Sequence, residues 1–186
     1  QSESISFDYG RVRSASFDTS QGFGLRSISG DAAGYAHSSE LSDEAIKRAS
    51  ATVKAVRSGH GGIYADAPTG TNAKLYSEDN PLGDIAFEDK VGVLSEIDAY
   101  LRAKDPRVAQ VMASVSGEWQ AVQIIRPDGY RAADIRPLVR LNISVIAQDG
   151  DRMESGSHGT GGRTSYQTYL DPNNWRGYAD EALRQA

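Results

Sequence analysis

A turn signal between two stretches of strand pattern constrains the fold of this chain more than any other feature. Residues 128–145 read DGYRAADIRPLVRLNISV, and Gly159-Thr-Gly-Gly-Arg163 follows shortly afterwards. Asp128-Gly129 is typical of a tight turn, because glycine tolerates positive φ and the aspartate side chain accepts hydrogen bonds from the backbone after it. Pro137 has a fixed φ and no N–H, so we expect a buried strand to begin there and to run from Leu138 to Ala147.

The rest of the chain predicts strands and helices in separate runs. We expect an antiparallel meander of three or four short strands from Ser4 to Ser39, because apolar and polar residues alternate there. The predicted elements that follow are a helix from the N-cap Ser42 to Ser58-Gly59, a helix over 87–104, a hairpin of 107–116 and 118–126 around Ser116-Gly117, the strand 138–147, a turn at Asp149-Gly150, a strand from Arg152 to about Tyr169, and a helix from Asp171-Pro172. The fold class is therefore α+β, with a largely antiparallel, twisted sheet and two or three helices packed on one face. The first helix should bury Ile46, Ala49, Val53 and Val56.

Three segments describe the expected organisation of the chain. Residues 1–58 hold the strand meander and the first helix, 59–85 form a long loop rich in Gly, Pro, Asn and Asp, and 86–186 hold a helix, two hairpins and the C-terminal helix. Long loops of this kind are commonly functional or mobile. The chain starts at Gln1 without a methionine and ends in a helical pattern, so we expect it to be part of a longer protein.

Composition excludes several classes of function. The chain has 25 acidic and 20 basic residues, a net charge of −5, and no cluster of basic residues. Direct binding to nucleic acid is disfavoured, because it needs a concentrated basic surface. Without cysteine there can be no disulfide, cysteine-bound zinc or thiol nucleophile within the chain. The apolar runs are too short to cross a membrane and no signal-peptide pattern is present, so a soluble, cytoplasmic protein is expected.

The glycine-rich segment is the first candidate binding site, with His158, Gly159, Gly161, Gly162 and Arg163 as its residues. Glycine allows close approach and leaves main-chain groups free, so this strand could bind an extended peptide as an added strand, with Arg163 meeting a carboxylate or carbonyl. The alternative is a twisted or bulged strand in which glycine relieves crowding and His158 is solvated. A phosphate site is disfavoured, since the segment leads into a strand and not into a helix.

A charge cluster of Asp134, Arg136 and Arg140 is the second candidate site. The arginines could bind a substrate terminus or a partner subunit, because a guanidinium pairs well with a carboxylate. We favour a structural ion pair between Asp134 and one of the arginines, because close opposite charges near turns usually have a structural role. No pair of carboxylates and no nucleophile motif predicts catalysis within this chain.

These motifs resemble those of the TldD/PmbA family, first described as modulators of DNA gyrase and as peptide-maturation proteins. The resemblance rests on the Asp134-x-Arg-Pro-Leu-Val-Arg-Leu run, on Gly161-Gly-Arg163, on Gly22-Phe-Gly-Leu-Arg26 and on Gly34-Tyr35-Ala36. It covers nearly the whole chain and is weakest over 59–85. The Asp134 run and Gly161-Gly-Arg163 are similar to the TldD side of the family.

The resemblance implies a zinc metalloprotease that cleaves unfolded peptides and holds its metal with a helical His-Glu-x-x-x-His motif. None of the histidines here, His37, His60 and His158, is followed by Glu. The zinc ligands are thus expected beyond Ala186, with no catalytic or metal-binding residue in this chain and no activity for it alone. The family also implies a heterodimer with a TldE/PmbA-like subunit, or a homodimer, that encloses the active site and takes up peptide by strand pairing. The alternative is a noncatalytic interaction module, either the partner subunit or a gyrase-binding regulator.

Overall fold

The structure is a computed structural model that describes residues 1–54 and 75–186. The chain divides into two compact units, one made of Gln1–Asp18 with Lys74–Ala186 and the other of Thr19–Ala73. The predicted end of the first helix at Ser58-Gly59 and most of the predicted loop over 59–85 lie outside the described residues.

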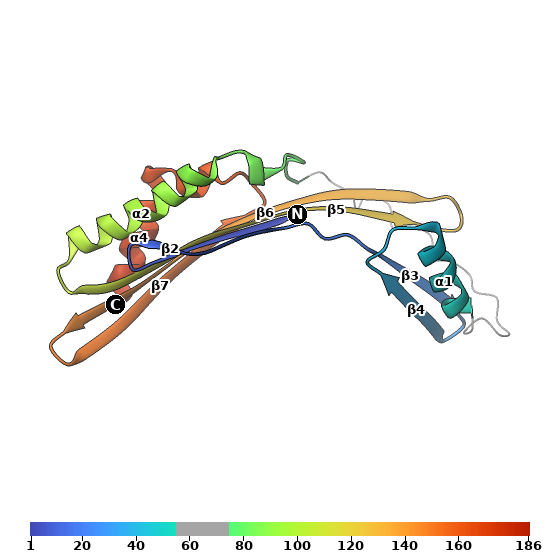
Figure 1. The fold of residues 1–186 in the computed structure, drawn as a ribbon, viewed down its shortest axis with the longest axis horizontal. Coiled ribbons are helices and arrows are strands. Elements are labelled where there is room, and N and C mark those ends of the chain that lie inside the picture. Colours follow the sequence, from blue (N-terminus) through green and yellow to red (C-terminus); the bar gives the residue numbers. More distant parts are fainter. Residues whose placement is uncertain (55–74) are drawn as a thin grey trace. The chain divides into compact units, whose positions relative to one another are not determined.

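The larger unit is built on a five-stranded antiparallel sheet with the strand order β2-β1-β5-β6-β7. Its strands are β1 (Ser2–Asp8), β2 (Arg11–Asp18), β5 (Val108–Ile125), β6 (Arg131–Asp149) and β7 (Arg152–Gly162). Its helices are the 3-10 turn η2 (Pro81–Gly83), α2 (Phe87–Lys104), the short α3 (Gln167–Leu170) and α4 (Pro172–Gln185). Figure 1 shows α2 and α4 lying on the same face of this sheet.

Alternation along the strands places the core between the sheet and the helices. The sheet contributes Ile5, Phe7, Val111, Ala113, Val115, Val139, Leu141, Ile143 and Val145 to this core. Leu94, Ile97 and Leu101 of α2 and Trp175, Ala179 and Ala182 of α4 close it from the other side. The residues between these positions on the strands include many serines, so the opposite face of the sheet is polar.

The smaller unit consists of the two-stranded sheet β3 (Phe23–Ser29) and β4 (Ala32–Ser38) with helix α1 (Asp43–Lys54) packed on it. The predicted N-cap is confirmed, since the Ser42 hydroxyl accepts a hydrogen bond from the backbone N–H of Ala45 at 3.1 Å. Ala49 and Val53 are buried as expected, but Ile46 is exposed and Ala45 takes the place expected for it. Val56, the fourth residue predicted to be buried, lies outside the described residues.

The α+β class and the antiparallel sheet are confirmed, whereas the pairing of the first four strands is not the single meander that was expected. β2 pairs with β1, and β3 pairs with β4 in a separate sheet. β1 also pairs with β5, which follows about a hundred residues later. Alternation gives the two faces of a strand but does not identify its neighbour.

The hairpin predicted around Ser116-Gly117 is wrong, because β5 continues through both residues. Gly117 pairs with Glu3 on one side and with Val139 on the other. A Cβ atom at this glycine would lie 2.7 Å from Leu82 Cδ2 and closer still to the Tyr166 hydroxyl. Gly117 therefore permits close packing and makes no turn.

Two strand boundaries also differ from prediction. β6 begins at Arg131, seven residues before the expected start, and contains Pro137. The missing N–H is tolerated because β6 pairs only with β5 there, and its pairing with β7 starts at Val139. β7 ends at Gly162 and not near Tyr169, because Tyr166 turns into the core and begins the short helix α3.

Candidate functional site

The glycine-rich segment lies on β7 at one edge of the five-stranded sheet. β7 pairs with β6 from Asp149↔Arg152 to Val139↔Gly162 and with no other strand that the structure describes. The backbone N–H of Ser157 points away from β6 and donates to Gln185 Oε1 at 3.5 Å. An edge strand exposes such groups along one side, and they can pair with an incoming extended chain.

The glycines of β7 are also needed for contacts within the protein. A Cβ atom at Gly159 would lie 2.9 Å from the Arg140 guanidinium, and one at Gly161 would lie 2.5 Å from the Val139 carbonyl oxygen. At Gly162 it would lie 2.7 Å from the Tyr169 hydroxyl. Relief of crowding thus accounts for part of the glycine content, and it is compatible with a role for the open edge.

His158 lies on the side of β7 that faces α4. Its ring stacks on that of Tyr178, with 5.2 Å between the ring centroids and an interplanar angle of 8°. The residue is half-buried, whereas one interpretation of the sequence expected a solvated side chain. Its described contacts are those of a packing residue between strand and helix.

Three of the predicted charged residues come together around a tyrosine that the sequence did not single out, and we call Tyr76, Asp134, Arg136 and Arg163 the Tyr76 cluster. Arg136 Nε lies 2.7 Å from Asp134 Oδ2, and the Tyr76 hydroxyl donates to the same carboxylate at 3.3 and 3.4 Å. The Arg163 guanidinium lies 5.0 Å from the centre of the Tyr76 ring. It also donates to the Pro137 carbonyl oxygen at 3.5 Å. The cluster therefore lies where β7 ends and β6 continues without it.

The charges of the cluster stabilise one another. The hydrogen bond from Arg136 lowers the pKa of Asp134, and Tyr76 and Arg163 lower it further. Asp134 in turn raises the pKa of Arg136. The carboxylate stays ionised at neutral pH and is already occupied by donors. With one acidic and two basic groups, the cluster carries a net positive charge.

Arg140, the third predicted residue of the charge cluster, lies apart from the other two. Its Nε donates to Asn142 Oδ1 at 2.9 Å, and its guanidinium lies over Gly159. Alternation along β6 places both side chains on the face of the sheet opposite α2 and α4. The spacing of these residues in the sequence could not tell whether Arg140 pairs with Asn142 or with Asp134.

The sequence did not predict Tyr76 as a site residue, because Tyr76 lies at the end of the long connection between the first two helices. A chain segment without periodicity gives no indication of where it returns to the fold. The sequence shows only that Tyr76 is an aromatic residue in a segment rich in Gly, Pro and Asn. This does not predict which residue its side chain contacts.

Across residues 1–54 and 75–186, no three His, Cys, Asp or Glu side chains lie together as they would to bind a metal ion. The helices in this part of the chain are all too short or too polar to span a bilayer.

Comparison with known proteins identifies the class to which this fold belongs. Residues 1–57 match the model of the PmbA/TldA metallopeptidase domain 1, and residues 80–186 match that of the PmbA/TldA metallopeptidase central domain. The chain therefore belongs to the PmbA/TldA metallopeptidase family, which confirms the resemblance to TldD/PmbA proteins.

The similar sequences include proteins named metalloprotease TldD homologues. The one from Haemophilus influenzae is 34% identical over 194 residues, which cover 100% of this chain and 40% of that protein. The one from Buchnera aphidicola subsp. Schizaphis graminum is 30% identical over 169 residues, covering 90% of this chain and 35% of the relative. The chain thus spans about two fifths of the length of such relatives.

Solved structures share the fold at low sequence identity. A protein from Bacteroides thetaiotaomicron described as a modulator of DNA gyrase matches 98% of this chain and 42% of its own, with a TM-score of 0.76 and 14% identity. TldE from Thermococcus kodakarensis matches 98% of this chain and 41% of its own, with a TM-score of 0.67 and 17% identity.

Proposed function

We propose that this chain binds peptide and contacts a partner subunit within a TldD-like zinc metallopeptidase that cleaves unfolded or extended peptides. The observation that carries the proposal is the glycine-rich edge of β7, which has no strand beside it among the described residues. Edge strands of this kind bind extended chains through main-chain hydrogen bonds, which suits substrates of varied sequence.

The residues present here would bind and orient the peptide, and they do not fit a metal site. The described part of the chain contains no ligand set for zinc. In the proposed enzyme, zinc held by ligands outside this chain would supply the chemistry that polarises the scissile carbonyl and activates a water molecule. This chain is accordingly expected to have no peptidase activity by itself. The Tyr76 cluster lies at the end of β7, where its net positive charge would favour an acidic group of a bound peptide.

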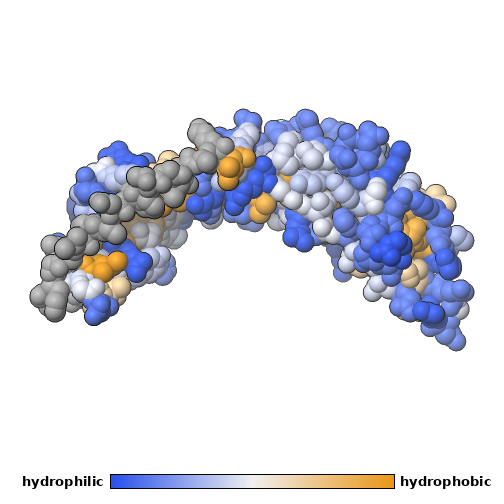
Figure 2. Space-filling view, turned by 180° about the vertical axis from the view of Figure 1, so that it is seen from behind, coloured by the Kyte–Doolittle hydropathy of each residue, from blue (hydrophilic) through white to orange (hydrophobic). Residues whose placement is uncertain are grey.

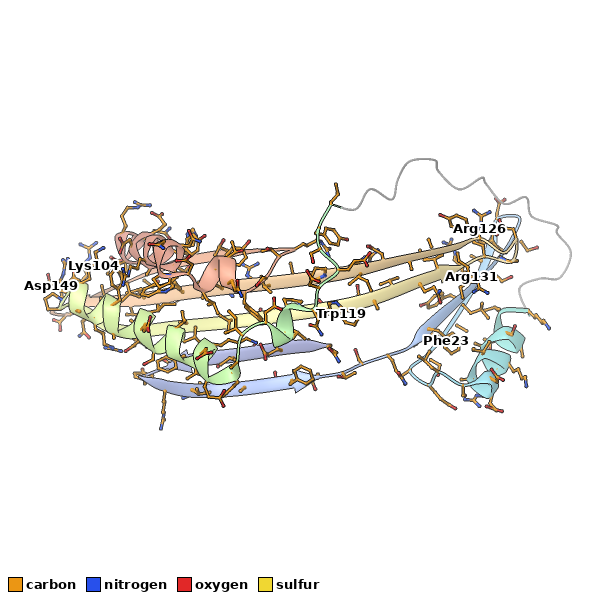
Figure 3. The ribbon with its side chains drawn as sticks, turned by 90° about the horizontal axis from the view of Figure 1, so that it is seen from above. Phe23, Lys104, Trp119, Arg126, Arg131 and Asp149 are labelled. Atoms are coloured by element: carbon orange, nitrogen blue, oxygen red, sulfur yellow. The ribbon has the colours of Figure 1, made fainter. Side chains whose placement is uncertain are left out.

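A second subunit is proposed because part of the sheet extends as a two-stranded ribbon. We call residues 119–137, from Trp119 in β5 to Pro137 in β6, the β5–β6 arm. In this arm β5 and β6 pair only with each other among the described strands. Figure 3 shows Trp119 at the start of the arm and Arg126 and Arg131 near its tip.

Apolar side chains of the arm are open to solvent, including Ile124, which is 56% exposed, and Ile125, which is 62% exposed. A two-stranded ribbon is marginally stable in water and gains from a partner that covers it. A TldE/PmbA-like subunit is the proposed partner, with a second copy of this chain as the homodimeric form. We place the assembly in the cytoplasm, because the chain has no cysteine for the disulfides that stabilise many exported proteins.

The alternative is a noncatalytic module of the same family, such as the TldE-type subunit. The fold does not separate the two, because a TldE structure shares it. The identity of 34% to a protein named metalloprotease TldD homolog favours the catalytic subunit. Direct nucleic-acid binding is not proposed, given the net charge of −5.

The test uses two variants at the β7 edge, in a full-length family protein that carries this chain's sequence. Gly162→Val adds bulk at the terminal residue of β7, and Ser157→Pro removes an N–H that points away from β6 and that donates to Gln185 Oε1 when no peptide is bound. We expect both variants to reduce kcat/KM on an unfolded peptide by about tenfold or more. This is the effect of losing one or two main-chain hydrogen bonds to the peptide. Urea unfolding of each variant measures the accompanying change in stability.

The matched control is Gly92→Val, which adds the same bulk on α2 at a position with nothing within 4 Å. It should leave peptide cleavage unchanged. The proposal fails if the β7 variants lose stability and cleavage to the same extent, or if cleavage survives both substitutions.

A further inference from the structure

The β1–β2 ladder contains a bulge that changes the direction of one arginine. Ser6 pairs with Ser14 and Phe7 pairs with Val12, so Arg13 is the extra residue on β2. A bulge of this kind bends the strand and turns the extra side chain out of the regular alternation. Arg13 contributes to the lining of a pocket on the sheet surface, together with residues from β1, β5 and β6.

This pocket lies on the face of the sheet that α2 and α4 leave uncovered. It has a volume of about 250 Å³, and its lining includes Arg13, Ser6, Asp8, Ser114, Asn142 and Ser144. Their neighbours along the strands, such as Ile5, Ile143 and Val145, are buried in the core on the other side. Phe7, Met112 and Ala113 complete the lining, so polar side chains and apolar surface meet in this open pocket, which is formed by three adjacent strands and the bulge.

The groups in the pocket differ in whether they are already paired. Asp8 accepts a hydrogen bond from Gln110 Nε2 at 2.9 Å, and the Ser6 hydroxyl lies 2.7 Å from that of Ser14. Asn142 Oδ1 accepts from Arg140 at 2.9 Å, which leaves the amide N–H groups of Asn142 as donors. Arg13 has no hydrogen bond or ion pair with any residue in the described part of the chain. The free groups are thus mainly donors, and the strongest of them is a guanidinium.

We propose that this pocket binds a carboxylate group of a peptide, with Arg13 as the principal contact and the Asn142 amide as a second donor. A guanidinium matches the planar geometry of a carboxylate and can donate two parallel hydrogen bonds. Arg140, which is bonded to Asn142, adds positive charge beside the pocket, whereas Asp8 is held by Gln110. The choice of a peptide as ligand rests on the proposed function. The carboxylate can come from the C-terminus or from an acidic side chain.

Binding to the 186-residue chain tests this site without any need for cleavage. Three acetylated alanine peptides serve as probes: one with a free C-terminal carboxylate, the same peptide amidated, and an amidated peptide with a single glutamate. NMR titration follows the side-chain amide of Asn142 and gives the Kd. We expect the amidated alanine peptide to bind about tenfold more weakly than a carboxylate-bearing one, as for the loss of a charge-assisted hydrogen bond.

Arg13→Gln should remove that difference between the peptides, and Arg11→Gln is the matched control. Arg11 lies on the same strand, carries the same charge and is exposed, but it does not line the pocket. Preference for the free terminus or for the glutamate peptide identifies the source of the carboxylate. Equal binding of acid and amide, no binding of any probe at the Asn142 amide, or equal effects of the two arginine variants would overturn the proposal. If the acid and amide peptides bind equally but are still held along β7, the carboxylate site is wrong and the proposed function stands.

Discussion

Lys90 is a buried lysine whose charge is stabilised by neighbouring groups. Its side chain is 1% exposed, and Nζ donates to Glu3 Oε1 at 2.6 Å and to the Leu82 carbonyl oxygen at 2.9 Å. The ammonium also lies 4.4 Å from the centre of the Tyr166 ring. The Tyr166 hydroxyl donates to the same Glu3 carboxylate at 3.2 Å. These groups join β1, η2, α2 and the start of α3 at one buried point.

Removing the carboxylate from this point should destabilise the larger unit strongly. We expect Glu3→Ala to lower the free energy of unfolding by about 3–5 kcal/mol, because it leaves a buried ammonium without its counter-charge. The double variant Lys90→Met/Glu3→Gln should be more stable than Glu3→Ala, since no unpaired charge remains and glutamine still accepts from Tyr166. Urea unfolding gives the free energy of unfolding of the unsubstituted chain, of Glu3→Ala and of the double variant. A loss below about 1 kcal/mol for Glu3→Ala would show that water reaches the ammonium.

At this scale the sequence indicated the types of residue better than their partners. The Asp134–Arg136 ion pair could be predicted, because two residues of opposite charge at i and i+2 on a strand share a face. Tyr76, Glu3 and Lys90 could not, because their contacts join segments that are 58 and 87 residues apart. Local patterns contain no information about such distant pairing.

Turns and strand interiors use glycine for different physical reasons. At Asp128-Gly129 the glycine has φ of 88° and the Tyr130 N–H donates to Asp128 Oδ1 at 3.0 Å, as the sequence predicts. Gly150 likewise has positive φ, at 60°. Gly117 is extended and lies beneath Tyr166 and Leu82. The sequence Ser-Gly alone could not distinguish a tight turn from a site of close packing.

Two glycine-to-alanine substitutions separate these effects at the scale of the elements. Gly117→Ala should lower the free energy of unfolding by about 1–3 kcal/mol, because the added methyl group overlaps the Tyr166 hydroxyl and Leu82. Gly92→Ala is the control within α2, where a Cβ atom meets nothing within 4 Å. It should raise stability by about 1 kcal/mol through helix propensity. Chemical denaturation of both variants checks the signs, and a neutral Gly117→Ala would mean that η2 and α3 move aside.

For the whole molecule, one face of the large sheet is covered by helices and the other is polar. Figure 2 shows a surface that is largely hydrophilic, with separate hydrophobic patches. The layering could be predicted, because alternating strands and two amphipathic helices require it. The order β2-β1-β5-β6-β7 and the extension of the β5–β6 arm could not, because no sequence pattern marks which strands pair.

Association with a partner is the prediction that belongs to this scale. Ile125→Glu should weaken binding of a TldE/PmbA-like subunit, or self-association of the chain, by about tenfold or more, because it places a charge in a desolvated interface. Phe17→Glu is the control, since Phe17 is 59% exposed on β2 and lies outside the arm. Sedimentation velocity measures the assembly, and circular dichroism checks that the fold persists. Equal weakening by both variants would argue against the arm as the interface.

The contact between α4 and β7 passes through main-chain atoms at Gly156. A Cβ atom there would overlap the Ala182 carbonyl oxygen and would lie 2.6 Å from the Ala186 backbone nitrogen. Because backbone meets backbone at this point, the spacing between helix and edge strand depends little on which side chains surround it. The sequences of β7 and α4 can therefore diverge widely without displacing the edge, provided that position 156 stays glycine. The proposed peptide-binding edge would then keep its geometry while the side chains along it change.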